Sequence, residues 1–479
     1  MGFVSDLISA VKQSISLRKD VENVFEETAV ISQKMQDLIP VFNDITAGEP
    51  GWLDPEDDTV HSISMASYID NFTAGLVCLN LEVNVSGGSR SEQLQKNVDY
   101  LMAKIVDNVA DALGNVGIMF KPNGENIDYI QPGYFVPLET NSNGDILGCA
   151  FKTERTIGKN HYTKWEMHRF EKRGDSKIYK ITNKAYKSEN PDKLGDECSL
   201  SEVDDWADLD PVVIIENIDK PLYAYFGMPM PNNVDRQSPL SLPIWYGCIE
   251  ELACLDYAWS RKSAEVDDSR HTTFVPSNAI KYAEQENIKL PRYIEGIEMG
   301  MGNDTIHDHV VQLLTEQRIR DINSNLAMIS AKCGFSQSTF KLDEKTGLMT
   351  ATQVEADDQE TIRTIKTIRD RLKTAIDQTI YACNVMLDNK GETPSGTYKV
   401  DYEWGDITYN YKEDRAMWLS YVDRGWIKPE RYLEKFEGMT EEEAAQYVKE
   451  AKEALTADQN FNVSEAGGNE AGGNEDADT

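Results

Sequence analysis

The first 120 residues carry apolar side chains at spacings of three and four, which is the periodicity of an amphipathic helix. Three segments show this pattern: Asp20–Leu38, Ser64–Leu76 and Ser91–Leu113. Between the first two, Gly48-Glu-Pro-Gly-Trp52 and the acidic run at residues 54–58 combine helix breakers with charge, so we expect a solvated loop there. The pattern predicts a helical N-terminal region.

Short strands replace helices between Gly117 and Tyr225. They are separated by turn sequences such as Asn143-Gly-Asp145 and Arg173-Gly-Asp175. Because no helix-length segment separates consecutive strands, we expect antiparallel pairing and an α+β fold. The expected strands are Ile127–Ile130, Ile146–Phe151, His161–Arg169 and Lys177–Ile181.

Two long helices with a small insert between them are predicted next. The first begins at Ser241, a candidate N-cap with Pro243 in the first turn, and runs to about Asp268 with Asp256 on its polar face. The second runs from Asp304 to Gly334. Together they predict a two-helix stalk with a tip. The tip contains expected strands at Thr272–Val275 and Tyr293–Met299 and a short helix near Ser277–Gln285.

A third long helix follows a loop at Phe335–Met349. Thr350 and Gln353 have the spacing of a capping box, and the apolar stripe continues to Asp388. A helix of that length would be about 57 Å long at about 1.5 Å per residue, which suggests a spine in an assembly. Its middle, Arg363–Lys373, is strongly basic.

The C-terminal part reads as two strands, three helices and a tail. Thr440 and Glu443 again have capping-box spacing. The sequence Glu-Ala-Gly-Gly-Asn occurs twice, at 465–469 and 470–474, and its acidic, glycine-rich composition predicts a disordered tail. The expected elements are strands Thr397–Glu403 and Ile407–Tyr411 and helices Glu413–Asp423, Pro429–Phe436 and Thr440–Leu455.

Composition narrows the class of protein. The 479 residues include 82 acidic and 48 basic side chains, for a formal net charge of −34, which argues against generic binding to nucleic acid or to an anionic membrane. The most apolar stretch, Ala74–Leu81, is too short to cross a bilayer. Seven scattered cysteines without a CxxC pair predict buried free thiols in a cytoplasmic environment.

Sequence motifs of enzymes are missing. The chain has no GxxxxGK[ST], GxSxG or HExxH, so we predict no catalytic residue, cofactor or metal. On the helix expected there, His307 and His309 would point about 200° apart and would not converge on a metal. Because the chain has so many carboxylates, some pair could always serve as the acid and base of a glycosidase, and the sequence favours no particular pair.

Several motifs, in order and spacing, resemble the portal proteins of tailed bacteriophages, in the siphophage branch that infects Gram-positive hosts. The resemblance covers about residues 40–456, and Gln353 stands where the family usually has Glu. Its motifs include Ile127-Asp-Tyr-Ile-Gln-Pro-Gly-Tyr-Phe-Val-Pro-Leu138, Cys149-Ala-Phe151, His161-Tyr-Thr-Lys-Trp-Glu-Met-His168, Pro221-Leu-Tyr-Ala-Tyr-Phe-Gly-Met-Pro229 and Met349-Thr-Ala-Thr-Gln-Val354.

The resemblance implies a portal fold and a dodecameric ring at one capsid vertex, assembled in the host cytoplasm. The implied partners are double-stranded DNA in the channel, the terminase large subunit, the head-completion adaptor, and the major capsid and scaffolding proteins. The implied parts are a wing at 1–240, stem helices at 241–268 and 304–334, a clip at 269–303, a tunnel loop at 335–349, a spine helix with wing strands at 350–411, a crown at 412–456 and a tail at 457–479.

The same resemblance suggests which residues meet DNA or partners. In the tunnel loop, Lys341 and Lys345 would touch DNA while Asp343 and Glu344 keep the contact loose; alternatively these charges pair with one another or with neighbouring subunits. The basic segment of the spine either faces the channel or is a solvated face bonded to acidic neighbours; its cations are Arg363, Lys366, Arg369, Arg371 and Lys373. The clip residues expected to contact terminase or adaptor are Arg270, Phe274, Tyr282, Arg292 and Tyr293.

Two other function classes stay open: an acidic scaffold or adaptor without a channel, and a carboxylate-based hydrolase. The portal interpretation also changes the meaning of the charge. Twelve copies would carry 12 × −34 = −408, and an acidic wall would let DNA slide instead of holding it.

Overall fold

The structure is a computed structural model in which the chain forms two compact units, Met1–Gly405 and Asp406–Thr479. The described residues are 17–54, 56, 59–124, 126–174, 176–191, 193–268, 272–276, 285, 294–297, 307–309, 314–342, 351–389, 397–405, 411–437 and 439–451.

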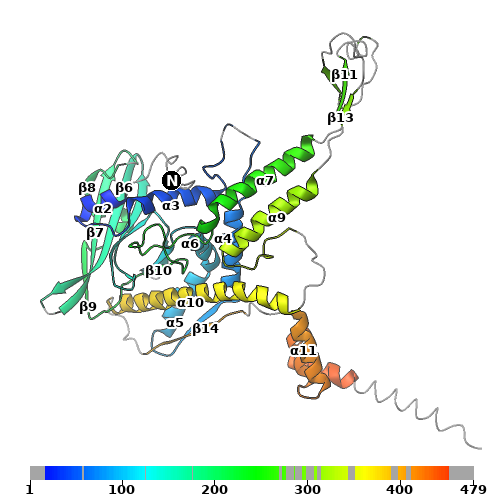
Figure 1. The fold of residues 1–479 in the computed structure, drawn as a ribbon. Coiled ribbons are helices and arrows are strands. Elements are labelled where there is room, and N and C mark those ends of the chain that lie inside the picture. Colours follow the sequence, from blue (N-terminus) through cyan, green and yellow to red (C-terminus); the bar gives the residue numbers. More distant parts are fainter. Residues whose placement is uncertain are drawn as a thin grey trace, which may run out of the picture. The chain divides into compact units, whose positions relative to one another are not determined.

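The N-terminal region is helical, as its periodicity predicts, but two expected helices are each divided (Figure 1). The first is interrupted because Glu26 adopts a left-handed φ of 58° and Ser32 starts a new helix, accepting a 3.3 Å hydrogen bond from the Met35 N–H. The other divided helix is the one expected over Ser91–Leu113, which is interrupted at residues 103–104. The helices are α2 (Leu17–Phe25), α3 (Gln33–Ala47), α4 (Met65–Val77), α5 (Ser91–Met102) and α6 (Ile105–Gly114).

The strand-rich region forms an antiparallel sheet, which confirms the predicted pairing. The order is β4-β5-β6-β7-β8, and β9 pairs with the half of β7 that β8 leaves open. Tight turns at Gly158 and Gly174, both with φ near +64°, connect the three longest strands. The strands are β4 (Phe135–Thr140), β5 (Ile146–Ile157), β6 (Asn160–Arg173), β7 (Ser176–Ser188), β8 (Asp196–Cys198) and β9 (Val212–Glu216).

Two smaller antiparallel sheets also belong to the first unit. One has the order β10-β2-β3, and the other pairs β1 with β14, which returns from far along the chain. The expected strands Ile127–Ile130 and Thr397–Glu403 correspond to β3 and β14. The strands are β1 (Glu82–Ser86), β2 (Ile118–Asn123), β3 (Asn126–Ile130), β10 (Ala224–Phe226) and β14 (Lys399–Glu403).

Helix α10 (Ala351–Asn389) confirms the predicted long helix and organises the core of the first unit (Figure 1). It packs against β2, β10, α4 and α5. Its C-terminal half continues the core into a cluster with Tyr179 and Leu222. The side chains of its apolar face are at most 2% exposed: Ile365, Ile368, Leu372, Ile376 and Ile380.

Helices α7 (Ile249–Asp268) and α9 (Thr315–Lys332) lie side by side as a hairpin (Figure 1). The predicted start at Ser241 is wrong: residues 238–243 have no helical structure, and the backbone N–H of Ser241 donates to the Tyr225 hydroxyl at 2.7 Å. The helical region begins instead with the 3₁₀ turn η3 (Tyr246–Cys248).

The expectation that Asp256 faces solvent is also wrong. Asp256 is 3% exposed and accepts 3.0 Å hydrogen bonds from Ile63 N–H and Trp52 Nε1. These bonds attach the loop between α3 and α4 to helix α7.

Three short strands lie between these helices in sequence. Strand β11 (Thr272–Pro276) pairs in parallel with β12 (Ile294–Ile297) and antiparallel with β13 (His307–His309). The first two lie where strands are predicted. The third occupies the predicted start of the second helix, so that prediction is wrong: pairing with β11 holds residues 307–309 extended, and α9 begins only at Thr315.

The second unit contains helices α11 (Tyr411–Asp423) and α12 (Pro429–Glu437) and a helix at residues 441–451. Trp418 packs edge-on against Phe436 at 5.8 Å between ring centroids. The capping box is confirmed: Thr440 N–H donates to Glu443 Oε2 at 3.0 Å, and Glu443 N–H donates to Thr440 Oγ1 at 3.3 Å. Tyr411 belongs to α11 and not to the expected strand, whose other residues lie outside the described part.

Gly117 offers a test of the packing between β2 and β10. Its φ is +91°, and a Cβ there would lie 2.6 Å from the Tyr225 ring and 2.7 Å from the Phe226 carbonyl oxygen. We expect Gly117→Ala to lower the free energy of unfolding by about 3 kcal/mol, through left-handed strain of about 1–2 kcal/mol plus overpacking of about 1–3 kcal/mol. Gly133→Ala is the control, because Gly133 has a similar φ of +89° and a Cβ added there would have no non-neighbouring atom within 4 Å. Equal losses in chemical denaturation would show that the close contact with Tyr225 is unimportant.

Candidate functional site

The chain leaves the α7–α9 hairpin through a glycine that is fixed to helix α10. Gly334 has φ +79°, and its carbonyl accepts a 2.7 Å hydrogen bond from Thr364 Oγ1. Ser336 N–H donates to Thr361 Oγ1 at 3.1 Å. A Cβ on Gly334 would lie 2.7 Å from Thr364 Oγ1, so glycine serves both the turn and the close approach. The predicted end of the second hairpin helix at Gly334 is confirmed.

An aromatic cluster holds the next residues against helix α4. Phe335 and Phe340 pack edge-on against Phe72 at 5.8 and 5.4 Å between ring centroids, and Tyr68 contacts Phe340 at 5.9 Å. Phe335 is fully buried and Phe340 is 7% exposed. Such ring pairs stabilise a contact by about 0.5–1.5 kcal/mol beyond their area. Phe335 and Phe340 therefore anchor this segment in the core, while Gln337 and Ser338 between them are exposed.

Asn323 of α9 fixes the last described residues of this segment. Its Oδ1 accepts from the Leu342 N–H at 2.9 Å, and its Nδ2 donates to the Leu342 carbonyl at 3.2 Å. Lys341, one of the predicted tunnel-loop residues, is exposed beside this clamp. The other three, Asp343, Glu344 and Lys345, lie outside the described residues.

The five cations of the basic segment of α10 do not share one environment. Arg363, Lys366 and Lys373 are exposed, and the Lys373 ammonium lies 5.0 Å from the Tyr402 ring centroid. Arg371 is half-buried and lines a cavity of about 380 Å³ together with Lys220, Asp145 and Asp219. Arg369 is only 8% exposed. Treating all five as one solvent-facing set is wrong at Arg369.

Arg369 binds backbone carbonyls from two distant segments. Its Nε donates to the Val77 carbonyl at 3.0 Å and its Nη2 to Leu76 at 2.9 Å, at the C-terminus of α4. Its Nη1 donates to Gly405 at 2.8 Å, and its guanidinium lies 5.1 Å from the Trp404 ring centroid. A cation at a helix C-terminus satisfies carbonyls that have no partner within the helix. Arg369 therefore joins α10, α4 and the residues after β14.

Of the predicted clip residues, only Phe274 lies in the described part. It belongs to β11, opposite Glu295 of β12 and His307 of β13. Arg270, Tyr282, Arg292 and Tyr293 lie outside the described residues.

The sequence reasoning missed a buried charged network on strand β6. The Glu166 carboxylate accepts hydrogen bonds from Lys121 Nζ at 2.7 Å, Lys164 Nζ at 3.0 Å and His168 Nε2 at 2.7 Å. The Nδ1 of His168 is 2.9 Å from the Tyr179 hydroxyl, whose oxygen accepts the Leu222 N–H at 3.1 Å. The alternation of Lys164, Glu166 and His168 along one strand is the available signal, because alternate residues share a face of the sheet.

The pKa values in this network indicate a structural ion cluster. Burial alone would raise the pKa of Glu166, but Lys121, the His168 hydrogen bond and Lys164 outweigh it and place the pKa well below its usual value. Burial lowers the pKa of His168, so its imidazole is neutral near pH 7. A glycosidase acid needs the opposite shift, a raised carboxyl pKa. Glu166 therefore gives the hydrolase hypothesis no support.

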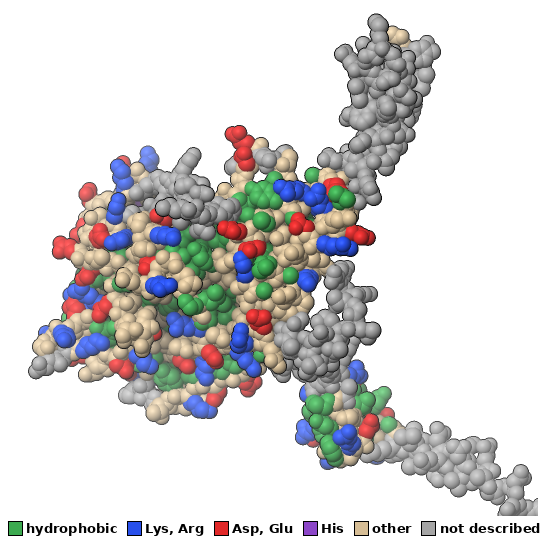
Figure 2. All heavy atoms as spheres, viewed as in Figure 1, with side chains coloured by type: hydrophobic (Ala, Val, Ile, Leu, Met, Phe, Trp, Pro, Cys, Tyr) green, Lys and Arg blue, Asp and Glu red, His purple; other side chains and the backbone are tan. Residues whose placement is uncertain are grey.

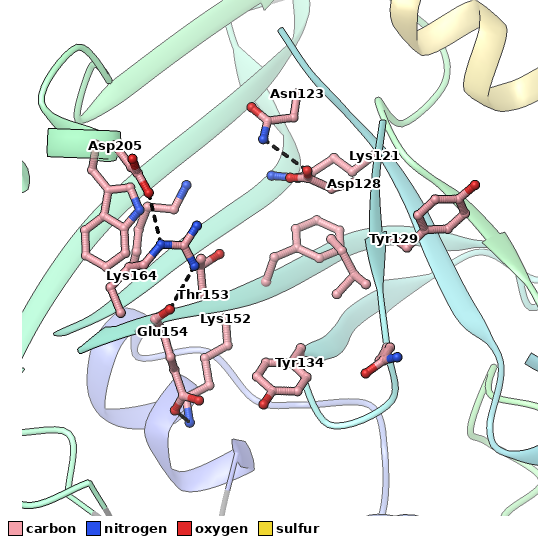
Figure 3. Close-up of a pocket in the computed structure, with 15 residues that line it drawn as sticks. Lys121, Asn123, Asp128, Tyr129, Tyr134, Lys152, Thr153, Glu154, Lys164 and Asp205 are labelled. Atoms are coloured by element: carbon pink, nitrogen blue, oxygen red, sulfur yellow. Dashed lines mark hydrogen bonds and ion pairs between the residues drawn. The ribbon is translucent and has the colours of Figure 1, made fainter. Parts of the chain in front are cut away.

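Lys121 and Lys164 also line a cavity of about 680 Å³ between β2–β3 and β5–β6 (Figure 3). Its other charges have neighbours of opposite sign or polar partners: Arg155 donates to Asp205 at 3.0 Å, and Asn123 donates to Asp128 at 3.0 Å.

Within the described ranges, no three His, Cys, Asp or Glu residues gather as potential metal ligands. A search of the same residues finds no helix with the length and apolarity needed to span a bilayer.

Arg369 and Arg363 provide a matched pair for testing these assignments. We expect Arg369→Met to lower the free energy of unfolding by about 3 kcal/mol, because buried carbonyls lose charged donors. Arg363→Met, on the exposed side of the same helix, should change it by about 0.5 kcal/mol or less. Urea unfolding of both variants is the measurement. An Arg369 variant as stable as the Arg363 variant would contradict the structural role of Arg369.

Comparison with protein families places these elements in a known group. Residues 121–457 match the family described as phage portal protein, SPP1 Gp6-like. The match spans more than half of the chain and runs from β2 through the hairpin and α10 into the second unit. A comparison with curated proteins found no match. The chain belongs to the phage portal protein family, and its fold is the α+β fold that the sequence predicts.

Proposed function

We propose that this chain forms a ring of twelve copies at one capsid vertex, through which DNA is packaged and later ejected. The family match over residues 121–457 carries the proposal, because portal proteins are structural components of the phage virion. The hairpin α7–α9, the strands between its helices and the long helix α10 supply the elements that such a conduit needs.

The proposed parts follow the observed elements. The hairpin is the stem, and β11–β13 belong to a clip that binds the terminase large subunit and later the head-completion adaptor. The N-terminal helices, the sheets other than β11–β13, and α10 form the wing, and the helices of the second unit form the crown. The major capsid and scaffolding proteins are the proposed partners during assembly.

The channel is proposed to handle DNA by repulsion with a few weak attractions. A ring of twelve would carry −408 before counterions, from 12 × −34. Repulsion between such a wall and phosphates acts over a Debye length of roughly 8–10 Å at physiological salt. Lys341 and Lys345, repeated around the ring, would add short-lived contacts that Asp343 and Glu344 weaken.

One face of the described surface supports this division of roles. Figure 2 shows Lys and Arg side chains interspersed with Asp and Glu over the face in view. A tight DNA-binding protein instead concentrates its cations on one patch or stripe. Contact with DNA is therefore assigned to a few tunnel-loop positions and not to a broad basic surface.

The mass of the purified protein tests the ring. Each chain has a mass of 54.0 kDa, so twelve copies give 12 × 54.0 = 648 kDa. We expect light scattering after size-exclusion chromatography to give a mass of this size, and negative-stain images to show a ring with a central hole. A monodisperse 54 kDa species would contradict the proposal.

Charge reversal tests the DNA contacts. We expect Lys341→Glu combined with Lys345→Glu to shorten the packaged genome, because the wall would then only repel the duplex. The control is Lys96→Glu combined with Lys159→Glu, which changes the net charge equally at exposed positions on α5 and in the β5–β6 turn. The measurement is packaged DNA length by pulsed-field electrophoresis. Equal genome length in both double variants would refute the role of the two tunnel-loop lysines.

A further inference from the structure

Two of the seven cysteines meet where the α7–α9 hairpin joins the rest of the first unit. Cys248 ends η3, which leads into α7, and Cys333 directly follows α9. Their Sγ atoms are 3.8 Å apart, and their exposed fractions are 1% and 2%. All seven cysteines are free thiols, and on α7 the neighbouring Cys254 is exposed.

Hydrogen bonds orient this thiol pair. The Cys248 S–H donates to the Trp245 carbonyl at 3.2 Å, which leaves its sulfur able to accept the S–H of Cys333. The two sulfur atoms therefore face one another already. A disulfide requires them to approach from 3.8 Å to about 2.05 Å, so each sulfur has to move by less than about 1 Å.

We propose that Cys248 and Cys333 form a modification site: a thiol pair that a small-molecule disulfide oxidises to an intramolecular disulfide at the base of the hairpin. The bond would close a loop between residues 85 positions apart. It would join the two points at which the chain enters and leaves the hairpin. Lys332 and Glu251 already form an ion pair between the same two helices.

The reaction takes place in two exchange steps. A thiolate of the pair attacks the small disulfide, forms a mixed disulfide and releases one small thiol. The second protein thiolate then attacks the protein sulfur of the mixed disulfide and releases the other small thiol. The protein loses two electrons and two protons, and one small disulfide is reduced to two thiols.

The surroundings make the reaction slow and its product stable. The hydrogen bond to Cys248, followed by burial, raises the pKa of the Cys333 thiol well above its usual value, so few thiolates form while the site is closed. Once formed, a disulfide across a long loop restricts the unfolded chain and favours the folded hairpin. In one respect the inference rests on the proposed function. A virion component leaves the reducing cytoplasm for an oxidising medium, where a small-molecule disulfide can oxidise the thiol pair.

The alternative is that both thiols simply fill the core, as buried free cysteines often do. Peptide mapping separates the two interpretations. The test uses the full chain with Cys254→Ser, because Cys254 and Cys248 share the tryptic peptide Gln237–Arg261. The reduced protein is incubated with oxidised glutathione, unfolded in N-ethylmaleimide and digested with trypsin without reduction.

We expect Gln237–Arg261 to be recovered joined to Cys333–Lys341, with the loss of two hydrogens. We also expect the midpoint of thermal unfolding to rise by about 4 °C or more and to return after dithiothreitol. Cys333→Ser in the same background is the matched control and should give neither result. Recovery of Cys248 and Cys333 as separate maleimide or glutathione adducts would overturn the proposal, whether or not the control variant folds. Because the mapping uses purified protein, its result does not depend on the portal assignment.

Discussion

Burial of one face of helix α10 is the constraint on which the first unit depends. Burying a side chain such as Ile368 or Ile376 stabilises the fold by about 1.5–3 kcal/mol, and five such side chains align on this face. The helix then serves as the attachment for elements that are distant in sequence. Thr364 holds the end of the hairpin at Gly334, and Arg369 holds the end of α4. Near its C-terminus, Asp388 pairs with the buried Arg90 at 2.7 Å, which joins it to the start of α5.

Periodicity predicted the elements whose burial is local and regular. Helix α10 has a stripe of isoleucines at spacings of three and four, and the turn sequence Arg173-Gly-Asp175 separates two of the expected strands. The helix boundary at Gly334 and the capping box at Thr440 could also be predicted, because each is fixed by residues close in sequence. The α+β class follows from these elements together.

Several of the errors share one physical cause, a partner that comes from far along the chain. Asp256 and Arg369 are charged residues that usually face solvent, but Ile63 and Val77 provide backbone groups that make their burial favourable. The pairing of β13 with β11 holds a short polar segment extended where the local pattern favoured a helix. The network around Glu166 was missed for the same reason, since Lys121 lies on another strand. Residues assigned to the site from the family pattern therefore divide into exposed candidates, such as Lys341, and structural cations, such as Arg369.

The proposed ring changes the interpretation of the net charge of −34. In the proposed ring, the charge excess would repel DNA from every side and keep it mobile, whereas an isolated acidic chain would avoid DNA altogether. The most direct test of this account is an asymmetric cryo-EM reconstruction of DNA-filled particles that carry this chain. The account predicts a twelve-subunit ring of the chain at a single vertex, with duplex density in its lumen. Particles in which the chain occupies many vertices, or forms no ring around DNA, would contradict it.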